Sequence, residues 1–172
     1  MFLDFCKDFF LKRKLRNNYI QNPHFPTSDK IKNIGILIDE TYFFEKENLI
    51  KNLIDFGFLK TDIHILLFRN SIKKADQFLF PIFSNKDLKW NGSNNNQDVK
   101  NFTNQKFDLL INYYDAEKAA LILVSAQSKA SFKVGFSSID VRLNQFMIQS
   151  NVENYKIFIS ELLKYLKILK KI

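Results

Sequence analysis

The sequence predicts an α/β fold: a single three-layer, Rossmann-like sheet, doubly wound and mostly parallel. Short apolar runs alternate with helical stripes along most of the chain, the order expected of parallel strands with helices on both faces. The clearest unit lies within residues 107–138. It has a buried strand at Phe107–Asn112, a helix at Ala116–Ser125 capped by Asp115, and a strand at Phe132–Phe136.

The first thirty residues are expected to lie outside the sheet. Residues 2–18 carry Phe2, Phe5, Cys6 and Phe9 at helical spacing, which predicts an amphipathic helix. Its end is basic and contains Lys12, Arg13, Lys14 and Arg16. Because Pro23 and Pro26 break the chain, we expect a basic helix and a linker over 1–30 and the α/β domain over 31–172.

A βαβ unit opens the domain. The expected strands are Ile31–Ile38 and Ile63–Phe68, and the helix between them runs near Glu45–Phe56 until Gly57 ends it. His64 lies inside the second strand, and since no metal-ligand spacing surrounds it, we interpret it as structural. A short strand around Pro81, at 80–83, is expected at the sheet edge because proline donates no hydrogen bond.

The remaining elements are shorter, apart from the last helix. Residues 72–78 could form a helical turn or two, Asn94–Asn96 an exposed and mobile loop, and 98–104 a short helix. A last short strand is expected at Phe146–Ile148. Ser150 and Glu153 have the spacing of a capping box, which predicts a long terminal helix reaching about Lys170.

The composition bounds the class of protein. A chain of 172 residues with 46% apolar residues suits one domain with a real core. Its net charge of +8 favours anionic partners, although an AT-rich genome would also supply many lysines. Cys6 is the single cysteine, which indicates a reducing compartment, and no apolar run is long enough to span a membrane. We therefore expect a cytoplasmic protein.

The motifs for common chemistries are missing. The four glycines, at 35, 57, 92 and 135, form neither a GxGxxG turn nor a P-loop, and no GxSxG elbow or metal-ligand cluster occurs. We therefore expect no metal, no cofactor and no catalytic residue. Any ligand crevice should lie where parallel strands end, which gives Asp39, Arg69, Asn112, Asp115 and Ser137 as candidates. We expect Tyr42, Phe43 and Tyr113 to plug that edge.

Two resemblances follow from particular segments. The basic N-terminal helix, the KDLKW segment at 86–90 and the FDLLINYY…SAQSKASFKVGFS core resemble a small uncharacterised bacterial family of unknown function. The 107–138 core is also similar to the end of the N-terminal domain of heptosyltransferase-like glycosyltransferases. That family binds its nucleotide-sugar donor in a second domain, so this resemblance implies a related fold and a half enzyme without its donor site.

Two functions remain open on this evidence. The favoured one is a non-catalytic binding module whose basic helical arm recognises RNA, a ribonucleoprotein or a protein partner. A membrane surface is a less favoured partner, and the oligomeric state is left open. The alternative is a small or degenerate enzyme that binds a nucleotide or sugar at the carboxyl edge of the sheet.

Overall fold

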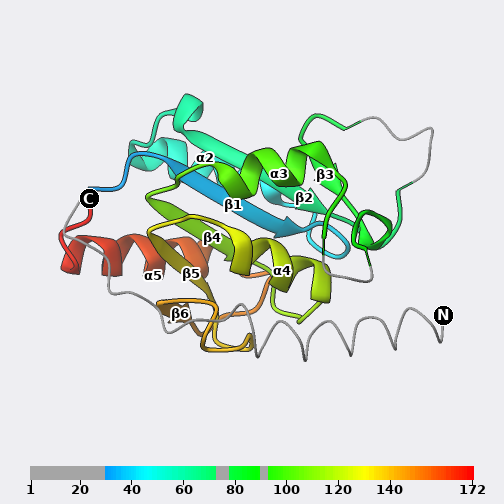
Figure 1. Cartoon of the computed structure of the whole chain (residues 1–172). Coiled ribbons are helices and arrows are strands. Elements are labelled where there is room, and N and C mark those ends of the chain that lie inside the picture. Colours follow the sequence, from blue (N-terminus) through cyan, green and yellow to red (C-terminus); the bar gives the residue numbers. More distant parts are fainter. Residues whose placement is uncertain (1–29, 73–77, 90–92) are drawn as a thin grey trace.

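Six parallel strands form one sheet in the order β3-β2-β1-β4-β5-β6 (Figure 1). The computed structural model describes residues 30–72, 78–89 and 93–172. The expected helix and linker over 1–30, the basic residues of that arm and most of the 72–78 segment lie outside this part. The strands are β1 (Ile34–Asp39), β2 (Ile63–Phe68), β3 (Ile82–Phe83), β4 (Leu109–Tyr113), β5 (Phe132–Phe136) and β6 (Phe146–Ile148).

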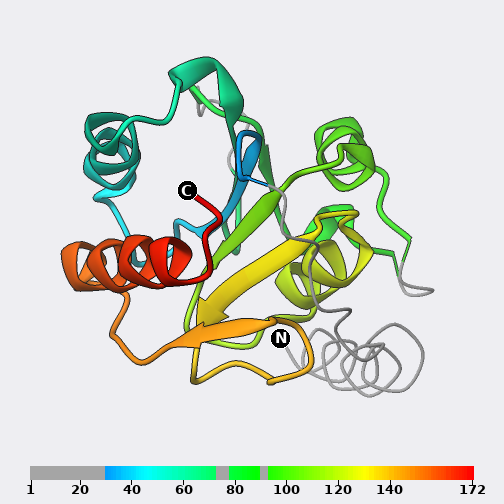
Figure 2. The same cartoon turned by 90° about the vertical axis from the view of Figure 1, so that its left-hand side faces the viewer.

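Helices cover both faces of the sheet, which confirms the predicted doubly wound α/β class. The helices are α2 (Lys46–Phe56), α3 (Gln97–Asn104), α4 (Ala119–Gln127) and α5 (Tyr155–Ile168). Contacts join α2 to α5 and α3 to α4, and Figure 2 shows the two pairs on opposite sides of the sheet. With both faces covered, all residues of β1 and β4 are buried, as their continuous apolar runs predicted.

Local signals explain several boundaries. Gly57 ends α2 with φ near 127°, a conformation that residues with a Cβ rarely adopt. Asn96 caps α3 by accepting hydrogen bonds from Asp98 N–H and Val99 N–H. Asn94 is buried, so the asparagine run is anchored to the domain and the expected exposed loop is wrong at this point.

Two predicted helix caps are wrong. The helix α4 begins after Lys118, three residues beyond Asp115, because Asp115 and Glu117 are tied to the loop after β5. Ser138 Oγ donates to Asp115 O at 2.9 Å, and Asp140 N–H donates to Glu117 Oε1 at 3.0 Å. These bonds hold 115–117 outside the helix.

The terminal helix also begins later than its capping box predicted. Asn154 is the N-cap of α5 and makes no side-chain capping bond, while Ser150 Oγ lies 3.3 Å from Asn151 O. Tyr113 Oη donates to Val152 O at 2.6 Å, so the backbone that would form the first turn is held against β4. The helix ends at Ile168, two residues short of Lys170, and Leu169 after it is 46% exposed.

Candidate functional site

The strand order places a topological switch point between β1 and β4, where the crossovers turn in opposite directions. Ligands of open parallel sheets bind in the crevice beside such a point, at the carboxyl ends of the strands. Asp39 is the last residue of β1 and Lys118 is the N-cap of the helix after β4. The two side chains form an ion pair with Lys118 Nζ 2.5 Å from Asp39 Oδ2.

The Asp39 carboxylate is fully engaged by its own chain. Its Oδ1 accepts a hydrogen bond from Thr41 N–H at 3.0 Å, and Thr41 Oγ1 lies 3.1 Å from Lys118 Nζ. The lysine also lies over two aromatic rings, 5.0 Å from the centroid of Phe68 and 5.6 Å from that of Tyr42. Asp39 and Lys118 therefore neutralise one another at the switch point.

A second ion-pair cluster lies on the neighbouring chain segments. Glu40 is 3% exposed and accepts from Arg69 Nε at 2.8 Å, and it also pairs with Lys46. Burial lowers the pKa of Lys46, but the hydrogen bonds and negative charges of Glu40 and Glu47 together outweigh this, so the pKa of Lys46 is raised. Glu40 N–H donates to Phe68 O at 2.9 Å, which joins this cluster to the end of β2.

Of the three aromatic residues expected to plug this edge, two lie in the core and one lies on the surface. Phe43 and Tyr113 are buried and pack together with ring centroids 4.7 Å apart. Tyr113 also packs edge-on against Phe136 and Phe158, so aromatic rings fill the α5 side of the edge. Tyr42 is 76% exposed and does not plug the edge.

Asn112 belongs to a different cluster on the α4 side of the sheet. Its Nδ2 donates to Ser125 Oγ at 2.8 Å and to Asn144 Oδ1 at 2.7 Å, and all three residues are buried. Lys133 Nζ donates to Ser125 O at 2.6 Å, and burial lowers the pKa of Lys133 to about 8. This cluster links β4, β5, α4 and the loop after β5.

Asp115 and Ser137 lie together on a third part of the edge. Ser138 Oγ, beside Ser137, donates to Asp115 O, and Ser137 N–H donates to Ile148 O at 3.0 Å. Ser137 also lines an open hollow of about 450 Å³ with Ser138, Gln149, Ser150, Asn151, Asn154 and Ile157. The five candidate residues are thus distributed over four groups: Asp39 with Lys118, Arg69 with Glu40, Asn112 with Ser125 and Asn144, and Asp115 near Ser137.

Glu40 and Lys118 complete this edge but were not among the sequence candidates. Glu40 directly follows Asp39, so the sequence was sufficient to predict a second acidic residue at this end of β1. The pairing of Lys118 with Asp39 could not be predicted from the sequence, because it depends on the late start of α4. Within residues 30–72, 78–89 and 93–172, no group of three or more His, Cys, Asp and Glu side chains could hold a metal ion, and no helix has the length and apolarity of a membrane span.

The opposite edge of the sheet has a different charge. The described loops at the amino edge, 30–33, 57–62, 105–108, 128–131 and 169–172, contain seven lysines and two aspartates. Six of these lysines are exposed, and we call them the amino-edge lysines: Lys30, Lys32, Lys60, Lys106, Lys129 and Lys170. By contrast, the loops after β1 and β4, at 40–45 and 114–118, contain four acidic residues and one lysine.

Helix dipoles do not account for the basic edge. The negative ends of α2, α3, α4 and α5 all lie there, but a cation interacts with the dipole mainly within the last turn. The last turns of α2, α3 and α4 contain no basic residue, and that of α5 contains only Lys167. The amino-edge lysines therefore form a separate basic surface.

The strand order defines a Rossmann-like α/β protein. Ion pairs between its own side chains occupy the carboxyl edge of the sheet, at and beside the switch point. The chain belongs to the family of unknown function DUF6913, which it matches over residues 7–169. This agrees with the resemblance to an uncharacterised family. No curated protein matches the chain.

Proposed function

We propose that this protein is a non-catalytic binding module that recognises RNA, alone or in a ribonucleoprotein, through the amino-edge lysines and the basic arm before them. The charge of the amino edge is the observation that carries the proposal. Exposed lysines on one surface attract a polyanion and release its counterions on binding. Lys12, Arg13, Lys14 and Arg16 would extend the same surface.

The connection of the arm to the domain supports this arrangement. Ile31 N–H donates to Lys171 O at 2.9 Å, which fixes the start of the domain at the amino edge. The basic residues of the arm precede Lys30 by fewer than twenty residues. The arm therefore joins the domain beside the amino-edge lysines, and one long anion could contact both.

The enzymatic alternative would place a nucleotide or sugar at the carboxyl edge. That edge carries the ion pairs Asp39–Lys118 and Glu40–Arg69, and the loops after β1 and β4 are predominantly acidic. A phosphate would have to displace a buried carboxylate from its cation, which is costly. The geometry therefore favours the binding module.

The test is fluorescence anisotropy with a labelled single-stranded RNA of about twenty nucleotides, titrated at several salt concentrations. We expect Lys60→Gln, Lys106→Gln and Lys129→Gln together to weaken binding, and the slope of log K against log salt to fall by about one unit per lost phosphate contact. Neutralising Lys12, Arg13, Lys14 and Arg16 together should have a similar effect.

The matched control removes three exposed lysines elsewhere. Lys86→Gln, Lys89→Gln and Lys156→Gln change the net charge equally but lie away from the amino edge. They should leave the slope nearly unchanged. If the intact protein has no RNA affinity at low salt, or if both triple variants behave alike, the proposal is wrong.

A further inference from the structure

The first four residues of β2 have no strand partner on their outer edge among the described residues. The edge strand β3 pairs only with the end of β2, Leu67 with Ile82 and Phe68 with Phe83. Leu67 N–H donates to Pro81 O at 2.9 Å, and Arg69 N–H donates to Phe83 O at 3.0 Å. Since alternate N–H groups of a strand point to the same side, Ile65 N–H also points outward, where no described backbone group accepts it.

Pro81 explains why the pairing stops there. In the register of these two parallel strands, the carbonyl of Ile65 would accept a hydrogen bond from the N–H of residue 81. Proline has no N–H, so the ladder cannot continue toward the start of β2. The backbone N–H and C=O of Ile65 are left at an open sheet edge, a template for a further strand.

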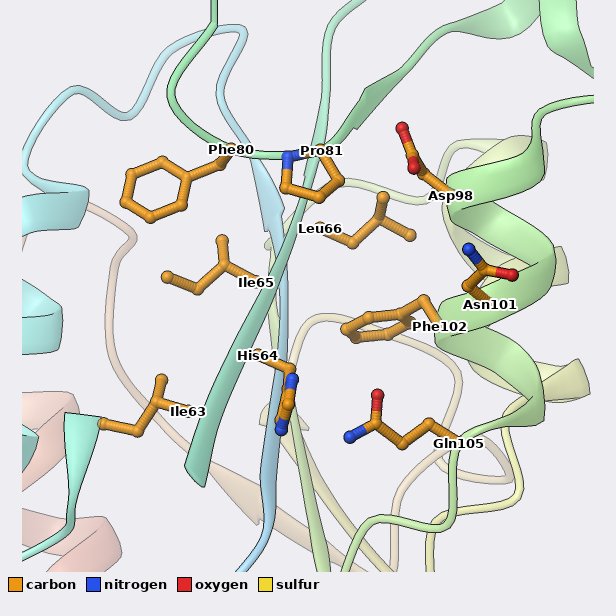
Figure 3. A pocket seen from close by; sticks show the side chains of 10 residues that line it. All are labelled: Ile63, His64, Ile65, Leu66, Phe80, Pro81, Asp98, Asn101, Phe102 and Gln105. Atoms are coloured by element: carbon orange, nitrogen blue, oxygen red, sulfur yellow. The ribbon is translucent and has the colours of Figure 1, made fainter. Parts of the chain in front are cut away.

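A hollow of about 320 Å³ lies along this open edge. In Figure 3 the side chains of Ile63 and Ile65 extend to one side of β2 and those of His64 and Leu66 to the other. Phe80 and Pro81 bound the hollow at one end, and α3 forms the wall beyond His64 with Asp98, Asn101, Phe102 and Gln105. Both faces of an added strand would therefore meet side chains.

We propose that this edge binds an extended peptide of a partner protein by strand addition, with alternating apolar and cationic side chains. The open backbone of β2 requires an extended partner that supplies N–H and C=O groups. Ile63, Ile65 and Phe80 form an apolar wall on one face. On the other face Asp98 is exposed, is paired with no cation among the described residues, and is the one formally charged side chain lining the hollow at neutral pH.

The length of the site follows from strand geometry. The stretch without a strand partner spans Ile63–Leu66, and at about 3.3 Å per residue it accommodates a segment of about four residues. Ile63 N–H already donates to Lys60 O, so the backbone groups open to a peptide are the carbonyls of Ile63 and Ile65 and the N–H of Ile65. An apolar side chain of the peptide would contact Ile65 and Phe80, and the next side chain would point toward Asp98. The hollow adjoins two amino-edge lysines, Lys60 and Lys106, but the two proposals use different ligands and different variants, so either can fail alone.

The test uses two blocked synthetic peptides, acetyl-Thr-Val-Lys-Val-Lys-Val-Thr-amide and its counterpart with Glu in place of Lys. Each is titrated into the isotopically labelled full chain and followed by backbone amide shifts. We expect the Lys peptide to bind the more tightly and to shift the amides of Ile63, Ile65 and Leu66. Ile65→Pro removes the outward N–H without touching the bonds to β1, so it should weaken binding at least about tenfold.

A charge reversal provides the second variant, in case Ile65→Pro unfolds the chain. Asp98→Lys should reverse the preference in favour of the Glu peptide. Glu47→Lys is its control, because Glu47 occupies the first turn of α2 as Asp98 does that of α3. The proposal is wrong if neither peptide binds, or if the amides that shift on binding lie elsewhere in the chain. Self-association that Ile65→Pro abolishes, without peptide binding, would assign the edge to a second copy and also overturn it.

Discussion

Lys118 Nζ lies 2.5 Å from Asp39 Oδ2, across the switch point of the sheet and 79 positions along the chain. The two side chains are 18% and 9% exposed, so the pair is largely shielded from water. It joins the end of β1 to the start of α4. In a doubly wound sheet this is the position where a bound ligand would otherwise meet the protein.

Lys118→Met should lower the free energy of unfolding by about 2–4 kcal/mol, because it leaves the Asp39 carboxylate buried without its cation. Adding Asp39→Asn should cost less than the two single changes predict, with a coupling of about 1–3 kcal/mol. Urea denaturation of the four proteins measures the cycle. Strictly additive effects would show that the pair contributes no interaction energy.

Gly135→Ala should lower the free energy of unfolding by about 1–3 kcal/mol through steric overlap. A Cβ at this position would lie 2.6 Å from Asn144 Nδ2. In a background of Asn144→Ser, which shortens the clashing side chain, Gly135→Ala should cost less than it does in the wild type. Gly57→Ala is the control. A Cβ there meets no atom within 4 Å, so its cost arises from the positive φ alone and Asn144→Ser should not relieve it.

Much of the sheet was predictable because local and global preferences agree there. The apolar runs at 63–68, 132–136 and 146–148 became β2, β5 and β6 with those bounds. The caps were less predictable, since Asp115 and Ser150 have the right local chemistry but tertiary hydrogen bonds hold their segments in other conformations. The sequence alone shows the local preference of each segment, but not the tertiary hydrogen bonds that override it.

The candidate site shows the same division between local and tertiary information. The carboxyl ends of the strands could be listed from the sequence, so Asp39 and Arg69 were placed after neighbouring strands. The sequence could not show that Asn112 lies apart from Asp39 and Arg69. Only the strand register places its side chain on the α4 face of the sheet, with Ser125 and Asn144. Pairing of Asp39 with Lys118 depends on where α4 begins, which no local pattern specified.

Tyr113→Phe should lower the free energy of unfolding by about 1–2 kcal/mol, because the buried carbonyl of Val152 loses its donor. The amides of 150–154 should also exchange faster with solvent, since the Tyr113 hydroxyl holds that segment against β4. Tyr42→Phe removes an exposed hydroxyl and serves as the control. Equal protection of 150–154 in both variants would contradict this role of Tyr113.

Lys133 should make the stability of the protein depend on pH between about 8 and 10.5. Burial lowers the pKa of Lys133 to about 8 in the folded chain, from 10.5 as the ordinary value. Between these values the unfolded state binds more protons than the folded state, so the free energy of unfolding rises with pH across this window. Below pH 8 both states are protonated, and the folded protein carries the full cost of a partly buried ammonium.

Lys133→Met tests this assignment, because it removes the titrating group and retains much of its apolar volume. At pH 7 the variant should be more stable than the wild type by about 1–3 kcal/mol, the desolvation cost reduced by the lost bond to Ser125 O. The difference between the two proteins should shrink as pH rises from 8 to 10.5. Lys129→Met, which removes an exposed lysine, should run parallel to the wild type over the same range. If the Lys133→Met and wild-type curves also stay parallel, Lys133 titrates alike in both states and its burial does not control stability.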